Sequence, residues 1–330
     1  MGTTGLLSKL FLNTVNTLEI HNLPSFLSLL ESRRDPAHRT RGLLTISNHV
    51  SVLDDPVIWG GILPLTTTFT PTSLRWTLGA ADICFKNPAL SAFFTAGQVL
   101  PTHRSKHSTY GGPFQASITQ AIQLLSAPAA AKGLYTTTGK DVYVSPAKWG
   151  SNRHAWVHVF PEGLVHQHRD CDLRYFKWGV ARLILESEPA PDVVPMFIEG
   201  TQGIMPENRG FPRFLPRVGR RVRVAFGEAV DYERTFGDLR TRWRGLVERR
   251  GVGKGELGEV EDERLRFGRE AQEIRIECAR RIREEIMKVR RGMGFPEGDE
   301  RFGLAETWRE DGEKKGRYRS GVDGSDINQD

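Results

Sequence analysis

Short apolar runs and longer helical patterns alternate along the first 230 residues of the chain. Runs rich in β-branched and aromatic residues predict buried strands, and these lie at 43–46, 155–160, 193–198 and 222–226. Between them, apolar residues recur at helical spacing around 88–96, 114–126 and 175–187. Strands that alternate with helices favour an α/β fold, with a mostly parallel central sheet flanked by helices.

The first 40 residues predict two amphipathic helices. Residues 3–19 carry an apolar stripe made of Leu6, Leu7, Leu10, Phe11 and Leu18. A second helix is expected after Asn22, with Pro24 in its first turn. These helices could pack on a core or lie flat on lipid, and the few cations on their polar faces leave both interpretations open.

The chain is predicted to divide into four parts. The N-terminal helices occupy 1–40, and the main α/β domain occupies 41–250 with a long surface loop at 127–152. From residue 231 onward the sequence becomes highly charged. This change predicts a charged helix over 251–291 and a disordered tail over 292–330.

Charge and cysteine content restrict the possible functions. The net charge is +6, and the excess belongs to residues 1–230, where 23 Lys/Arg face 16 Asp/Glu. Such a surface suits anionic lipid, whereas nucleic-acid binding is not expected because no basic motif with interleaved aromatic residues is present. The three widely spaced cysteines predict neither a disulfide framework nor a metal site.

The apolar segments are too short or too interrupted to predict a spanning helix. The beginning of the chain also has neither the pattern of a secretory signal nor that of a mitochondrial presequence. We therefore expect any contact with a membrane to be interfacial.

A polar stretch directly after the first strand of the α/β pattern carries candidate chemistry. His49 is followed five positions later by Asp54, so the chain can fold back into a His–carboxylate pair. The carboxylate would orient one ring nitrogen and leave the other as a general base for a hydroxyl. The same stretch also indicates a helix start, with Asp55 as cap and Pro56 in the first turn. Spacing alone does not decide between the two.

Three other segments add candidates for substrate binding. Glu162 and Gly163 follow the predicted strand 155–160, and glycine would let the backbone approach a ligand. Arg104 follows a short extended segment and could clamp a phosphate. Pro195 interrupts a predicted strand, which is plausible at an edge or beside a pocket.

These segments resemble the four motif blocks of the glycerolphosphate acyltransferase superfamily, and most closely the tafazzin family within it. The resemblance runs from about 42 to 230, through the strings SNHVSVLDDPVIW, RWTLGAADICF, WVHVFPEG and LRYFKWGVARLI. It implies that His49 and Asp54 are catalytic and that Arg104, Glu162 and Gly163 contact phosphate and glycerol. It also implies that Pro195 shapes the acyl pocket.

The resemblance implies acyl exchange between phospholipids and lysophospholipids without acyl-CoA or another cofactor. The expected substrates are cardiolipin, monolysocardiolipin and phosphatidylcholine. The expected location is peripheral, on mitochondrial membranes that face the intermembrane space. Two alternatives remain open at this point, namely an acyl-CoA-dependent lysophospholipid acyltransferase and a non-catalytic membrane-binding scaffold.

Overall fold

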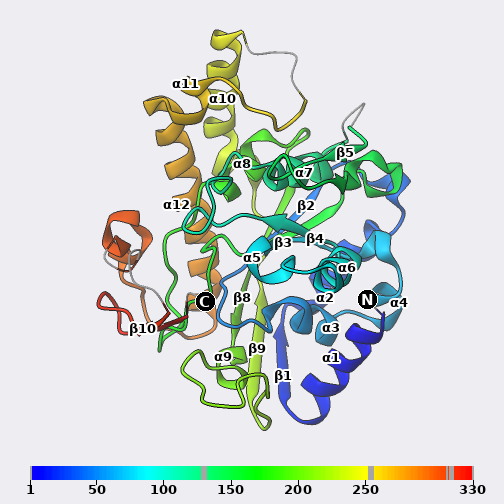
Figure 1. The fold of residues 1–330 in the computed structure, drawn as a ribbon, viewed down its shortest axis with the longest axis vertical. Coiled ribbons are helices and arrows are strands. Elements are labelled where there is room, and N and C mark those ends of the chain that lie inside the picture. The colour runs from blue at the N-terminus through cyan, green and yellow to red at the C-terminus, as the bar shows by residue number, and fades with distance from the viewer. Residues whose placement is uncertain (1, 128–131, 252–255, 310, 312–315, 329–330) are drawn as a thin grey trace.

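A seven-stranded sheet forms the centre of the molecule (Figure 1). The computed structural model describes residues 2–127, 132–251, 256–309, 311 and 316–328. The strand order is β1-β9-β8-β2-β7-β3-β4, and every neighbouring pair is parallel except β8 and β9. This confirms the predicted α/β fold with a mostly parallel sheet. The strands are β1 (Thr17–His21), β2 (Leu43–Ile46), β3 (Trp76–Ala80), β4 (Val99–Thr102), β7 (Trp156–Val159), β8 (Asp192–Glu199) and β9 (Arg221–Phe226).

Helices cover both faces of the sheet. Side chains of β8 alternate between the faces, so Val193 and Phe197 enter one core while Val194 and Met196 enter the other. The first core is closed by α7 (Ala116–Leu125), α8 (Gly179–Glu186), α10 (Tyr232–Arg250), α11 (Glu263–Phe267) and α12 (Arg269–Gly292). The second is closed by α1 (Gly2–Thr14), α2 (Leu23–Ser32), a π-helical turn (Asp54–Ile58) and α3 (Trp59–Ile62).

The N-terminal segment forms one helix and one strand instead of a helix that reaches residue 19. Helix α1 ends at Thr14, and Thr17–His21 pairs in parallel with β9. The prediction was wrong here because β9 leaves an edge of unpaired backbone groups, which a strand satisfies and a helix does not. Helix α2 starts directly after Asn22, as predicted.

One face of α1 packs tightly on α3 and the other is exposed. Ser8 and Leu12 are buried, and a Cβ added at Gly60 of α3 would lie 2.6 Å from the Ser8 Cβ. Leu7 and Leu10 remain exposed on the opposite side. The helix therefore combines a core-packing face with a face that is free to meet lipid.

Three short helices follow near the start of the main domain: α4 (Leu65–Thr68), α5 (Ala81–Cys84) and α6 (Pro88–Ala96). The predicted loop at 127–152 contains a small hairpin of β5 (Leu134–Tyr135) and β6 (Tyr143–Val144), and residues 128–131 lie outside the described part. Helix α8 is a core helix, because all but its first residue are buried. Even Arg182 is buried there, in an ion pair with Glu186.

The segment after residue 250 is more structured than its composition suggested. The expected charged helix appears as two helices, α11 and α12. Helix α12 packs beside α10 (Figure 1). The described residues of the tail, predicted as disordered, form two 3₁₀ turns and a hairpin of β10 (Arg317–Arg319) and β11 (Asp326–Asn328). Composition misled here, because a few apolar side chains, such as Trp308 and Ile327, are buried and hold the tail to the body.

Candidate active site

Loops from four parallel strands meet at one edge of the sheet. The strands β2, β7, β8 and β4 all end at this edge because they point in the same direction. His49 follows β2, Glu162 follows β7, Thr201 of α9 (Thr201–Ile204) follows β8, and Arg104 follows β4. Residues far apart in the sequence are therefore brought to one place.

His49 and Asp54 form the hydrogen-bonded pair that their spacing allowed. His49 Nδ1 lies 3.0 Å from Asp54 Oδ2, and the Asp54 side chain is fully buried. The same oxygen accepts the backbone N–H groups of Val50 at 2.7 Å and Ser51 at 2.9 Å. Thr201 Oγ1 donates to the other oxygen at 2.6 Å. Asp54 is therefore held rigidly. No described residue forms a hydrogen bond with His49 Nε2, and a neutral imidazole nitrogen of this kind is chemically able to accept a proton.

Neighbouring residues fix the loop and the imidazole ring. Asn48 exchanges two hydrogen bonds of 2.8 Å with the backbone of Ile198, which ties the loop to β8. The ring of Phe160 stacks on His49 with 4.2 Å between centroids. Ser51 is fully buried, and its hydroxyl accepts the backbone N–H of Leu53. Ser51 therefore acts as a turn residue here.

Glu162 supports the loop and does not face the cavity. Its Oε1 accepts the backbone N–H of His49 at 3.0 Å, and its Oε2 accepts the backbone N–H of Arg174 at 3.0 Å. The side chain is almost completely buried. The expectation that Glu162 contacts substrate is not supported, because both of its oxygens are occupied by the protein.

A large cavity of about 940 Å³ opens beside His49. Apolar side chains make up most of its wall, including Trp59, Leu78, Phe94, Ile118 and Leu183. Its volume and lining match the hydrocarbon part of a lipid better than a small polar metabolite. The arrangement therefore combines a histidine–carboxylate pair with an apolar cavity.

Comparison with known proteins places the chain in a family. Residues 28–199 match the family model described as Acyltransferase. A tafazzin from Saccharomyces cerevisiae is 36% identical over 317 residues, which cover 92% of this chain and 80% of the relative. The chain belongs to the tafazzin family of acyltransferases. This membership supports phospholipid acyl transfer and cardiolipin remodelling as its function.

Two further relatives are similar over most of the chain. An N-acylphosphatidylethanolamine synthase from Arabidopsis thaliana is 34% identical over 228 residues, which cover 68% of this chain and 67% of the relative. A Drosophila melanogaster tafazzin is 31% identical over 242 residues, 73% of this chain and 53% of the relative. Within the described residues of this tafazzin-family chain, no helix is both long and apolar enough to cross a bilayer.

Of the predicted substrate contacts, Gly163 and Arg104 line the cavity. Gly163 has a φ of 68°, and a Cβ added there would lie 3.0 Å from the Lys177 ammonium nitrogen. The positive φ favours glycine at this position, whereas the flexible end of the Lys177 side chain can move away from an added Cβ. Arg104 is already engaged, because its guanidinium binds the Asp82 carboxylate through two hydrogen bonds.

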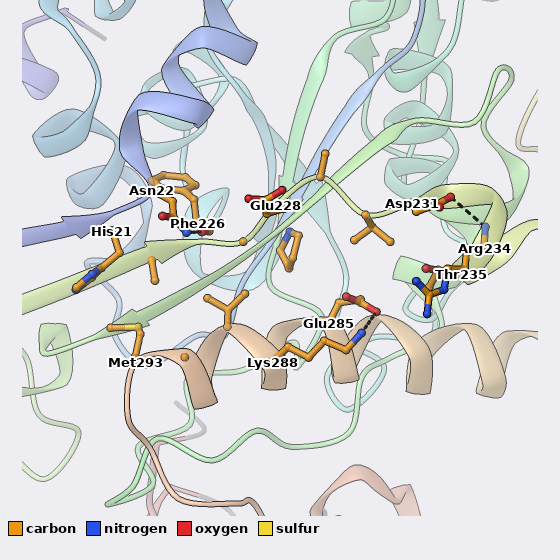
Figure 2. A pocket seen from close by; sticks show the side chains of 17 residues that line it. His21, Asn22, Phe226, Glu228, Asp231, Arg234, Thr235, Glu285, Lys288 and Met293 are labelled. Atoms are coloured by element: carbon orange, nitrogen blue, oxygen red, sulfur yellow. Dashed lines mark hydrogen bonds and ion pairs between the residues drawn. The ribbon is translucent and has the colours of Figure 1, made fainter.

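Pro195 does not line the cavity beside His49, so the structure gives no support to its predicted role in the acyl pocket. It sits within β8 opposite Ile46 and lines a second cavity of about 740 Å³ together with Val289 of α12. Figure 2 shows this second cavity, bordered by the end of β9 and by α12. Because β9 runs antiparallel to β8, its carboxyl end lies at the edge of the sheet opposite to the one that carries His49.

Several residues of the site were not found from the sequence. Asp55, expected to cap a helix, instead binds the buried Arg75 through both of its oxygens. Arg75 lay within a segment that carried the family resemblance, but nothing in its spacing indicated this partner. Thr201 and Lys177 likewise gave no local signal, because both act on residues distant in the sequence.

Proposed function

We propose that the protein is a CoA-independent phospholipid–lysophospholipid transacylase in which His49 is the general base. The observation that carries this proposal is the His49–Asp54 pair, in which Nδ1 faces Asp54 and the His49 residue lines an apolar cavity of about 940 Å³. A lysophospholipid hydroxyl is the acceptor and an acyl ester of a second phospholipid is the donor. Monolysocardiolipin and phosphatidylcholine are the pair that we propose.

His49 Nε2 removes the proton from the acceptor hydroxyl as its oxygen attacks the ester carbonyl of the donor. The buried Asp54 carboxylate stabilises the imidazolium that forms. When the tetrahedral intermediate collapses, the bond to the donor oxygen breaks and His49 returns the proton to it. One ester is made and one is broken, so the exchange is nearly thermoneutral and needs no activated donor.

Lys177 supplies a cation for a lipid phosphate. It lines the cavity above Gly163, and the structure records no acceptor for its ammonium group among the described residues. Burial is the main cause that lowers the pKa of Lys177, and the positive charges of Arg174 and Arg104 lower it further. Arg104 adds to this positive charge, although Asp82 already occupies its guanidinium. A phosphate would relieve the repulsion between these cations.

The apolar surface around the cavity is suited to a membrane interface. Val52, Ile83 and Phe93 all line the cavity and are strongly exposed, and Phe93 is 54% exposed. Helix α1 contributes Thr4 and Gly5 to the same cavity and leaves Leu7 and Leu10 exposed. We propose that this side lies on lipid, so that acyl chains enter the cavity directly. The proposed location is the mitochondrial membrane surface, facing the intermembrane space.

The decisive experiment is exchange in the absence of CoA. Purified protein is mixed with monolysocardiolipin and phosphatidylcholine that carries a labelled acyl chain, and labelled cardiolipin is measured by mass spectrometry. We expect transfer at the same rate with and without added CoA. Transfer that requires acyl-CoA would overturn the proposal in favour of the CoA-dependent lysophospholipid acyltransferase.

The variant His49→Ala tests the assigned base, and His38→Ala is the matched control because His38 is exposed and remote from the site. We expect His49→Ala to reduce exchange by about 10²–10⁴-fold, the range for loss of a general base. Liposome flotation should be unchanged in both variants. Unchanged exchange in His49→Ala would overturn the assignment of His49 as the base, whereas no exchange by the wild-type protein would favour the scaffold interpretation.

Lys177→Gln tests the phosphate contact, with Lys177→Arg as the charge-preserving control. We expect Lys177→Gln to raise the KM for monolysocardiolipin about tenfold while kcat changes little, since a group that binds equally in ground and transition states affects KM. Lys177→Arg should remain close to the wild type. A fall in kcat at constant KM would show that Lys177 does not bind the lipid phosphate.

A further inference from the structure

The loop that carries His49 is held on both sides by one irregular segment. Glu162 Oε1 accepts the His49 N–H at 3.0 Å, while the His166 N–H donates to the His49 carbonyl at 2.8 Å. Gln167 Nε2 donates to the Val50 carbonyl at 2.7 Å. The backbone of the proposed base is thus fixed by the segment 162–167.

This segment has no regular secondary structure of its own to keep it rigid. Between the end of β7 and the start of α8 the chain forms turns and a single isolated bridge. That bridge joins Gln167 to Asp326 of the C-terminal tail. A segment of this kind depends on outside contacts for its order.

The C-terminal tail supplies these contacts. Asp323 Oδ2 lies 2.7 Å from His166 Nε2, and both side chains are fully buried. The other face of Asp323 is satisfied by Ser325, whose N–H and hydroxyl donate to Oδ1 at 3.0 and 2.7 Å. On its far side, His166 Nδ1 approaches Glu162 Oε2 at 3.4 Å. A line of contacts therefore runs from Asp323 through His166 to Glu162.

Trp308 of the tail covers the same residues. Its ring meets His166 edge-on with 5.3 Å between centroids, and the Arg174 guanidinium lies 3.9 Å above it. Arg174 is the residue whose backbone N–H binds the second oxygen of Glu162. In Figure 1 the chain after α12 folds back on the α12 side of the molecule, where the hairpin of β10 and β11 lies.

A buried carboxylate and imidazole are costly unless each is paired. Burial by itself lowers the pKa of His166, but the contacts with Asp323 and Glu162 outweigh it and raise the pKa. The charged pair is therefore favoured in the folded protein, and its removal would leave His166 buried beside Glu162 with one partner fewer. A change at Asp323 would then reach the residue that holds the His49 N–H.

We propose that the C-terminal tail is part of the catalytic apparatus, with Asp323 acting as a positioning residue that orders the His49 loop through His166 and Glu162. This inference rests on the proposed role of His49 as the base. Asp323 touches no substrate in this scheme. Asp323 instead raises the fraction of molecules in which the His49 ring has the orientation that catalysis requires.

The test compares Asp323→Asn with Asp326→Asn in the full-length protein. Asp326 is a matched control, because its bridge to Gln167 is made by the backbone, which the substitution keeps, and its side chain binds only the surface Asn208 in the described structure. We expect Asp323→Asn to lower kcat for CoA-free exchange about tenfold at constant KM, and Asp326→Asn to leave both unchanged. Hydrogen exchange of peptides covering 47–54 should become faster in Asp323→Asn alone.

A double-mutant cycle separates positioning from general destabilisation. If Asp323 acts through His166, adding Asp323→Asn to His166→Gln should cause no further loss of kcat. Ser325→Ala is a milder variant that removes only one donor to Asp323, and we expect an intermediate fall in kcat from it. If Asp323→Asn does not fold, Ser325→Ala is compared with the wild type instead.

The results distinguish this inference from the proposed function. Wild-type kcat and unchanged hydrogen exchange at 47–54 in both Asp323→Asn and Ser325→Ala would overturn the positioning role, even if His49→Ala is inactive. Additive losses in the cycle would also overturn it. Active His49→Ala would instead defeat the proposed base, while the hydrogen-exchange comparison would still report whether the tail orders the loop.

Discussion

Glu162 accepts the backbone N–H of His49, and the distance from that nitrogen to Oε1 is 3.0 Å. The second oxygen accepts the N–H of Arg174 at the same distance. Through these two hydrogen bonds, the Glu162 carboxylate holds the backbone of the proposed base in place. It also connects two loops that lie more than a hundred residues apart in the sequence. We therefore predict that Glu162 contributes to catalysis indirectly, and this can be measured.

Glu162→Gln distinguishes positioning from substrate binding. Glutamine has one oxygen where glutamate has two, so one of the two backbone N–H groups would face an NH₂ group. We expect kcat for acyl exchange to fall about tenfold or more while KM stays constant, since an interaction that matters only in the transition state lowers kcat. A raised KM at normal kcat would show that Glu162 contacts substrate.

Thr201→Val tests the support behind Asp54. The hydroxyl donates to Asp54 Oδ1 at 2.6 Å, and both residues are buried. Valine keeps the shape but removes the donor, which should cost about 1.5–3 kcal/mol of unfolding free energy for a hydrogen bond to a charged group. We expect kcat to fall about tenfold as Asp54 loosens. Urea unfolding and the CoA-free assay measure the two effects.

The control for this variant is Thr241→Val on the exposed side of α10. Its hydroxyl donates to the Gly237 carbonyl at 2.9 Å, far from the active site. We expect no change in kcat and little change in stability. Equal effects at the two positions would contradict a specific role for Thr201.

Asp55→Asn tests the buried ion pair in the wall of the cavity. Arg75 is almost completely buried, and its guanidinium forms two hydrogen bonds with Asp55. Removing the carboxylate charge leaves a buried cation without its counter-ion, which typically costs about 3–5 kcal/mol of unfolding free energy. Urea unfolding at neutral pH measures this loss.

Glu31→Gln is the matched control, because Glu31 pairs with Arg34 on the surface at 3.2 Å. An exposed pair contributes only about 0–1 kcal/mol, so the control should remain near wild-type stability. If Asp55→Asn were as mild as Glu31→Gln, the ion pair would not be a major source of stability in this part of the fold.

Stability should depend on pH through His166 and Asp323. Burial lowers the pKa of His166, but Asp323 and Glu162 raise it above 6.5 overall; the neighbouring His168 ring lies 6.2 Å away between centroids. A raised histidine pKa stabilises the fold at low pH, and that contribution is lost as pH rises through the folded-state value. Burial raises the pKa of Asp323, yet His166 and Ser325 lower it below 3.8 overall.

The lowered Asp323 pKa contributes stability above 3.8, and this is lost only as pH falls through its folded-state value. The pair should therefore contribute fully between about pH 4 and pH 6.5 and progressively less above that range. We expect the difference in unfolding free energy between wild type and Asp323→Asn to be larger at about pH 5.5 than at about pH 9. A difference independent of pH would contradict the ionised pair.

The strands β2, β7, β8 and β9 and the helices α6, α7 and α8 followed from the sequence, whereas β3 and β4 were not predicted as strands. The spacing of His49 and Asp54 allowed their pairing, and the family resemblance implied it. Strand and helix periods are local properties, and a residue pair five positions apart needs only one turn to meet. The family resemblance extended this to the cavity wall at Gly163 and Arg104. These features depend on short stretches of chain, which a linear pattern can describe.

Only the tertiary structure decided which side chains surround the pair. The direction of β9 and the register of β8 put Pro195 in a different cavity, and the fold of the tail brought Asp323 to His166. Glu162 became a support for His49 because β7 lies beside β2. Such partners depend on strand order, strand direction and burial across the whole chain, and residue periodicity does not encode these long-range relationships.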